Sequence, residues 1–135
     1  YTAALADINA ELSKFSKSSV QLTLDQIKSF YGSIDYYTPD KPTPKKAFHT
    51  SFTIESATQE PLLQCILQLR RIITLHEGLR MQDIKRYGMV IYRRNIDSNN
   101  DLKKVTDTLT VNDPRRAIQL PQDVITAGLE ANPRK

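Results

Sequence analysis

Apolar side chains are spaced as on one face of a helix in three stretches of the chain. The first stretch predicts a helix over residues 3–16, and residues 16–19 are expected to end it. Its apolar positions are Ala4, Leu5, Ile8, Leu12 and Phe15. The second stretch, LTLDQIKSFYG, predicts a short helix in which Thr23 and Gln26 form a capping box and Gly32 is the stop. Residues 1–32 are therefore expected to be helical.

The third stretch has the clearest periodicity and predicts a pair of helices over residues 58–88. The first of the pair begins near Gln59, and Pro61 is tolerated in its first turn. Its broad apolar face is formed by Leu62, Leu63, Cys65, Ile66, Leu67, Leu69 and Ile73. A glycine inside a helix costs about 1 kcal/mol relative to alanine, so Gly78 indicates a hinge between two helices.

Charged residues surround this hinge and are expected to satisfy one another. They follow at three-residue intervals, at Glu77, Arg80, Asp83 and Arg86. We expect Glu77 at the close of the first helix, and Arg80 and Asp83 in the first turns of the second, to pair with one another or to cap exposed backbone groups. A buried bidentate Glu77–Arg80 pair is expected to fix the angle between the helices. His49 is isolated, His76 is expected to pack at the helix end, and the chain has no GxSxG, no phosphate-binding glycine loop and no HExxH. We therefore predict no catalytic site, no metal site and no cofactor.

Residues 33–57 show no sustained period and hold three prolines within six residues. A structureless stretch of this length is unusual inside a compact domain. We expect either a functional loop or a loop packed against a part of the protein outside this chain. Within it, FHTSFTI predicts a short extended strand.

Residues 89–135 are expected to hold one strand followed by an irregular tail. MVIYRR is strand-like, and the polar stretch NIDSNNDLKK follows as a turn region. Prolines and a glycine punctuate the tail, which is expected to be ordered but irregular. These are Pro114, Pro121, Gly128 and Pro133. The fold class predicted for the whole chain is mainly α.

Composition narrows the class of protein. The 135 residues, of which 39% are hydrophobic, are sufficient for one domain with a packed core. No apolar run is long enough to span a membrane, and the N-terminus lacks the pattern of a signal peptide. The chain opens in an amphipathic helix without a methionine, which suggests a segment of a longer protein, so any export signal is expected upstream of Tyr1. Cys65, the only cysteine, is expected to be a buried apolar side chain.

The net charge of +4 and the pI near 9.2 raise nucleic acid or an acidic surface as a partner. The basic residues, however, are scattered in pairs along the chain. The pairs are Lys45 and Lys46, Arg70 and Arg71, Arg93 and Arg94, Lys103 and Lys104, and Arg115 and Arg116. We expect no nucleic-acid partner. The alternative, a small basic nucleic-acid-binding helical domain, predicts binding that weakens steeply with salt.

Two separate motifs stand in the chain, one at residues 62–88 and one at residues 112–134. Residues 62–88 read LLxxILxxRRxxxLHEGxRxxDIKRxG, which is similar to the hallmark LLxxIlxERRxELafEGhRwfDLkRwG of the SusD/RagB family. The matching residues are Arg70, Arg71, Leu75, Glu77, Gly78, Arg80, Asp83, Lys85, Arg86 and Gly88. Residues 112–134 contain NDPRRAIQLPQDVI and ANPR, which are similar to the family's C-terminal segment. The likeness covers residues 60–135 well and residues 1–17 loosely.

The resemblance implies both a fold and a function. The fold is the helical, loop-rich C-terminal region of a SusD-like protein, a single region over residues 1–135 that normally packs on tetratricopeptide-like helical repeats absent from this chain. The function is non-catalytic capture of an oligosaccharide or peptide at the bacterial outer-membrane surface, for delivery to a TonB-dependent SusC-like transporter. A lipid anchor is implied on an upstream cysteine outside this chain. The hallmark residues are expected to be structural.

Tyrosines are the candidate ligand-binding residues. Sugar recognition uses flat aromatic faces beside groups that bond hydroxyls. Tyr31, Tyr36 and Tyr37 gather near the start of the long loop, beside Asp35 and Asp40. We predict that these tyrosines contact ligand. Two alternatives stand: the tyrosines anchor the loop onto the absent repeats, or the whole region only docks to the repeats and transporter.

Overall fold

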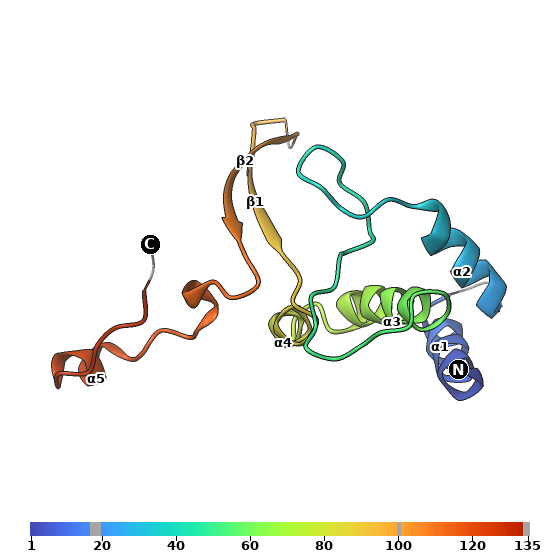
Figure 1. Ribbon diagram of the computed structural model, residues 1–135, viewed down its shortest axis with the longest axis horizontal. Helices are drawn as coiled ribbons and strands as arrows, with labels where there is room; N and C mark the ends of the chain where they lie inside the picture. The colour runs from blue at the N-terminus through green and yellow to red at the C-terminus, as the bar shows by residue number, and fades with distance from the viewer. Residues whose placement is uncertain (17–19, 100, 134–135) are drawn as a thin grey trace.

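The computed structural model describes residues 1–16, 20–99 and 101–133, and most of its regular structure is helical (Figure 1). Its elements are α1 (Thr2–Phe15), α2 (Leu24–Ser33), α3 (Gln59–Ile73), α4 (Arg80–Arg86), β1 (Ile91–Ile96), β2 (Leu102–Leu109), the 3-10 turn η1 (Pro114–Arg116) and α5 (Gln122–Thr126). The mainly helical class is confirmed. None of the helices in the described ranges is both long and apolar enough to cross a bilayer. Residues 17–19, in the predicted stop of the first helix, and Arg134 of the second motif lie outside the described residues.

The hydrophobic core lies where α1, α2 and α3 meet (Figure 1). Its buried members are Ile8, Ile27, Tyr31, Leu62 and Cys65. The predicted burial of Cys65 is confirmed, and burial raises the pKa of its thiol. Asn9 on α1 ties the start of the next helix to this core, because its side chain bonds both the N–H and the carbonyl of Leu22, at 2.8 and 2.9 Å.

Both ends of α2 are satisfied by side chains. The predicted capping box is confirmed: Thr23 and Gln26 exchange main-chain to side-chain hydrogen bonds of 2.8 and 3.2 Å. The predicted stop at Gly32 is wrong. A glycine ends a helix by taking positive φ, which Gly32 does not do, and α2 runs one residue further. The Lys45 ammonium reaches the helix end and donates to the Tyr31 carbonyl at 2.8 Å.

Residues 34–58 form no helix or strand, so the strand predicted in FHTSFTI is wrong. The main chain of this loop bonds to other elements instead of to a neighbouring strand. Gln64 on α3 accepts from the Lys46 N–H at 3.2 Å and donates to its carbonyl at 2.6 Å. The His49 N–H donates to the Tyr87 carbonyl at 2.9 Å. Partners scattered over two helices leave no straight edge along which a strand could pair.

The hinge between α3 and α4 is confirmed, but the ion pair expected there is wrong. Helix α3 ends at Ile73, and Gly78 takes a left-handed φ of 69° in the turn before α4. Glu77 lies exposed beyond the end of α3, and no ion pair joins it to Arg80 within the described chain. His76 is exposed in the same turn rather than packed.

The pair that joins the two helices is Arg70 with Asp83. Nε of Arg70 on α3 lies 3.1 Å from each carboxylate oxygen of Asp83 on α4. Asp83 is buried, whereas the Arg70 side chain is 41% exposed. Helix α3 ends at Ile73, four residues before Glu77, so Glu77 lies in the turn. Asp83 of α4 is the carboxylate that pairs with Arg70 near the end of α3.

The corner between α4 and β1 requires a glycine. Gly88 has a φ of 59°, and a Cβ at this position would lie 2.8 Å from the His49 carbonyl carbon and nearer still to its oxygen. The His49 ring adds a hydrogen bond, with Nδ1 3.0 Å from the Gly88 carbonyl oxygen. The long loop therefore passes directly against this corner.

After the corner, β1 and β2 form an antiparallel hairpin in which Ile91 pairs with Leu109. The predicted strand in MVIYRR is confirmed, since its last four residues, 91–94, are the first four of β1. Strand β2 was not predicted, because residues 102–104 were assigned to the turn region NIDSNNDLKK. These residues instead belong to β2, which pairs with β1, and the register of the pairing is irregular on either side of Arg94.

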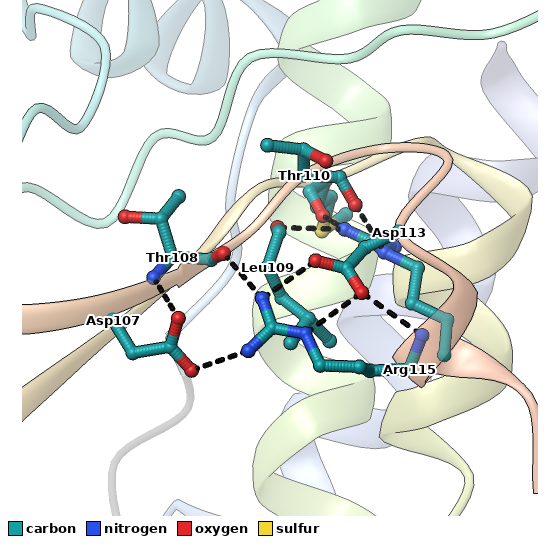
Figure 2. Close-up of polar contacts among 8 residues, drawn as sticks. Asp107, Thr108, Leu109, Thr110, Asp113 and Arg115 are labelled. Carbon is teal, nitrogen blue, oxygen red and sulfur yellow. Dashed lines mark hydrogen bonds and ion pairs between the residues drawn. The ribbon is translucent and has the colours of Figure 1, made fainter. Parts of the chain in front are cut away.

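The segment after the hairpin folds back on it through arginine. Arg115 donates to the Asp113 and Asp107 carboxylates at 2.6 and 2.8 Å and to the Thr108 carbonyl at 2.9 Å (Figure 2). Hydrogen bonding from Arg115 lowers the pKa of Asp113 to about 2. The tail, which was expected to be irregular, contains two short helical segments, η1 and α5. Figure 1 shows α5 apart from the other helices.

Arg116 is buried and donates only to main-chain carbonyls in the contacts that the structure describes. Its guanidinium reaches Thr110 at 2.5 Å and Leu109 at 3.1 Å at the end of β2. It also reaches Met89 at 2.5 Å and Ile84 at 3.5 Å, at the α4–β1 corner. One side chain therefore joins the C-terminal segment, the hairpin and α4.

Replacing Gly88 by alanine should destabilise the protein more than replacing Gly78. Both residues have positive φ, which costs alanine about 1 kcal/mol. Only at Gly88 does the new Cβ meet main chain, since Gly78 has no neighbour within 4 Å. Urea denaturation should therefore give a larger loss for Gly88→Ala, about 2–4 kcal/mol in total. Equal losses for the two variants would contradict the close approach of His49.

Replacing Arg70 by methionine should cost about 1–3 kcal/mol, because it leaves the buried Asp83 carboxylate without its partner. Lys14→Met is the matched control. It removes an ion pair with Glu11 in which the lysine side chain is 63% exposed, and should cost under about 1 kcal/mol. Thermal and urea unfolding of both variants measure the difference. A loss for Arg70→Met no larger than for the control would refute a structural role for the Arg70–Asp83 pair.

Candidate functional site

The three candidate tyrosines do not form one cluster. Tyr31 lies on α2 and its side chain is only 5% exposed. It therefore belongs to the hydrophobic core and not to the group of tyrosines expected near the start of the long loop. Tyr36 is 41% exposed and donates from its hydroxyl to Glu60 at 2.6 Å. Partial burial and the Glu60 hydrogen bond raise the pKa of Tyr36 to about 12. Tyr37 turns to the opposite side of the loop, toward the hairpin. Contact of these tyrosines with ligand stays a prediction.

Tyr37 is fixed by the hairpin. Its ring stacks on Tyr92 of β1, with centroids 5.6 Å apart and planes 11° from parallel. Arg94 of β1 donates to the Tyr37 hydroxyl at 3.2 Å and also bonds the carbonyl of Pro39. The Lys46 ammonium lies 3.1 Å from the centre of the Tyr37 ring. The Tyr37 ring therefore already has an aromatic and a cationic neighbour, and its hydroxyl already accepts a hydrogen bond from Arg94.

The position of Lys46 follows from its backbone. The buried Gln64 amide bonds both main-chain groups of Lys46, which fixes the residue against α3. Successive side chains of an extended segment point to opposite sides. Lys45 accordingly reaches the end of α2, while Lys46 extends toward Tyr37.

A cavity of about 260 Å³ opens beside Lys46, and we call it the cationic cavity. It is lined by Tyr37, Lys46, Arg71, Arg80, Ile84, Met89, Val90, Ile91 and Tyr92. Its basic residues come from three segments: Lys46 from the loop, Arg71 from α3 and Arg80 from α4. Burial, together with the charges of Arg71, Arg80 and Arg94, lowers the pKa of Lys46 to about 8. Burial and Arg71 likewise lower the pKa of Arg80.

The other charged hallmark side chains do not line this cavity. A larger hollow of about 780 Å³ between α3 and α4 includes Arg70 and Asp83, whose charges already satisfy each other. Arg86 lies 5.8 Å from the centre of the Phe52 ring. In the described parts of the chain, no group of three or more His, Cys, Asp or Glu side chains is arranged to hold a metal ion.

Sequence reasoning missed the cationic cavity. It singled out Tyr37, Arg71 and Arg80 for separate reasons, and it treated Lys46 only as part of a scattered basic pair. The missing information was the path of the loop, which brings Lys46 beside helices that begin more than a dozen residues later. Tyr92 within a predicted strand was the one available signal, because alternation places an aromatic ring on one face of the hairpin.

The charge of Lys46 should make stability rise with pH in the alkaline range. The ordinary lysine pKa of 10.5 applies to the unfolded chain, while the folded value is about 8. Between these pH values the unfolded chain binds more protons, so the free energy of unfolding rises as pH rises. The penalty of the charged amine is fully present below pH 8 and is relieved toward pH 10.5.

Urea unfolding at pH 8 and at pH 10.5 measures this effect as the difference between the unmodified chain and Lys46→Gln. The difference should shift in favour of the unmodified chain at the higher pH. Lys104→Gln, at an exposed position on β2, is the control and should show no such shift. Parallel pH profiles for the unmodified chain and Lys46→Gln would contradict the lowered pKa.

Comparisons of the chain with protein-family models, with curated proteins and with solved structures find no match. The family resemblance therefore depends on the motif residues alone.

Proposed function

We propose that this chain belongs to a non-catalytic nutrient-binding lipoprotein of the SusD/RagB kind. The protein captures an oligosaccharide or peptide at the outer-membrane surface and delivers it to a TonB-dependent SusC-like transporter. Its lipid anchor is carried by a cysteine upstream of this chain. In this proposal, residues 1–135 are the C-terminal region of the fold and pack on helical repeats that lie outside the chain.

The observation that carries the proposal is the contact between the two motifs. The hallmark ends at Gly88, and the second motif begins only at residue 112. Arg116 of the second motif nevertheless donates to the carbonyls of Ile84 and Met89, inside and next to the hallmark. Two stretches that resemble one family separately in sequence thus form a single packed unit. Such a unit is what a shared fold requires, and this supports the resemblance.

A docking role without ligand contact is the second candidate, and one surface favours it. Three large apolar side chains are exposed around the C-terminal end of α3, at Ile72, Ile73 and Leu75. Next to them lies a hollow of about 490 Å³ between α1 and α3, lined in part by Ile8 and Leu69. Exposed apolar patches of this kind mark surfaces that another element covers. The helical repeats of the same protein fit this surface, which does not include the residues of the cationic cavity.

Location in the source cell tests the proposal directly. Cells grown with labelled palmitate should yield a labelled protein, and protease added to intact cells should degrade it. A periplasmic protein of the same cells is the control and should stay protected. Gentle solubilisation should recover the protein with a large outer-membrane transporter. An unlabelled protein that resists protease in intact cells would overturn both the capture and the docking proposals.

A further inference from the structure

Cations converge on the cationic cavity from parts of the chain that are distant in sequence. Lys46, Arg71 and Arg80 line it together, and Arg94 adds charge close by. Like charges in a partly buried space repel one another and lose hydration. This arrangement raises the free energy of the protein unless an anion joins it.

The described chain supplies no such anion to these side chains. None of Lys46, Arg71, Arg80 and Arg94 takes part in an ion pair with a carboxylate within residues 1–16, 20–99 and 101–133. The charge of Asp83 raises the pKa of Arg80 against the effect of burial, but both Asp83 carboxylate oxygens are bonded to Arg70. The other basic clusters differ in this respect, since Arg115 meets Asp107 and Asp113.

The lining of the cavity strengthens any charge interaction inside it. Apolar side chains from α4, from the corner that follows it and from the start of β1 also line the cavity, at Ile84, Met89, Val90 and Ile91. They keep the local dielectric low, so an anion held there binds more tightly than on an open surface. The Tyr37–Tyr92 stack forms a rigid aromatic wall beside Lys46.

The size of the cavity indicates how much of a ligand enters it. About 260 Å³ is below the roughly 300–1,000 Å³ of sites that enclose a whole small molecule. The cavity therefore holds one charged group, and the rest of the ligand lies outside. Two guanidinium groups and an ammonium suit a planar carboxylate, to which arginine donates in parallel pairs.

We propose that the cationic cavity binds a carboxylate group of the captured nutrient, with Lys46, Arg71 and Arg80 as its donors and the Tyr37–Tyr92 stack beside it. This inference rests on the proposed capture function, whose ligand class it narrows to acidic molecules. The carboxylate belongs either to a uronic acid of an oligosaccharide or to the C-terminus of a peptide. The two sources share the same chemistry at the cavity.

Two matched ligand pairs test the proposal on the unmodified protein. One pair is a uronic-acid trisaccharide and its methyl ester, and the other is a tripeptide with a free carboxylate and its C-terminal amide. Calorimetry should show about tenfold tighter binding for the charged member of one pair, as expected for charge-assisted hydrogen bonds. The pair that shows this preference identifies the source of the carboxylate.

Variants then locate the effect. Lys46→Gln, Arg71→Gln and Arg80→Gln should each reduce the preference for the charged member to about threefold or less, while the exposed control Lys104→Gln should leave it at tenfold. Circular dichroism confirms that each variant is folded. A preference that survives all three substitutions, or that the control lowers equally, would overturn the assignment.

The outcomes separate this inference from the function on which it rests. If the charged and the uncharged member bind equally well in both pairs, capture stands and the carboxylate site is refuted. If none of the four probes, nor a neutral trisaccharide, binds to a protein shown to be lipidated and exposed on the cell surface, the carboxylate site is refuted and docking replaces capture.

Discussion

A long segment without helix or strand holds one shape only where other elements satisfy its main-chain groups. In this protein that constraint is met from outside the loop at Lys46, whose N–H and carbonyl both bond the Gln64 side chain on α3. A buried amide is well suited to this task, since it offers a donor and an acceptor side by side. The His49 N–H, which donates to the Tyr87 carbonyl, is a second such point. Lys45 reaches back to the end of α2 and Lys46 reaches forward to the hairpin because the backbone between them is fixed.

Arginine performs the corresponding task at the other end of the chain. The guanidinium of Arg116 is buried and bonds carbonyls at the end of β2 and at the α4–β1 corner, so it ties the tail to both without a strand ladder. Its neighbour Arg115 bonds two carboxylates and a carbonyl of the hairpin region (Figure 2). The adjacent arginines of the second motif therefore have different roles: one joins main chain and the other neutralises charge. Lysine could not provide the same fork of fixed donors.

Features set by local chemistry were predictable from the sequence. The apolar periodicity located α1 and α3, the Thr23–Gln26 capping box located the start of α2, and Gly78 marked the hinge. Predictions failed where a distant partner decides the outcome. Glu77 was expected to pair with Arg80 from spacing alone, but the early end of α3 gives that role to Asp83. The cationic cavity was missed for the same reason.

The contact between His49 and Gly88 bears on the order in which the chain assembles. The two residues are 39 positions apart, and their approach needs the corner that follows α4 to be in place. Helices and the turn at Gly78 depend on near neighbours and can form early, whereas closure of a long loop carries an entropic cost that delays it. Lys46 lies on that same loop. We therefore expect the cationic cavity to form only after this long-range closure, because Lys46 reaches its place through the loop.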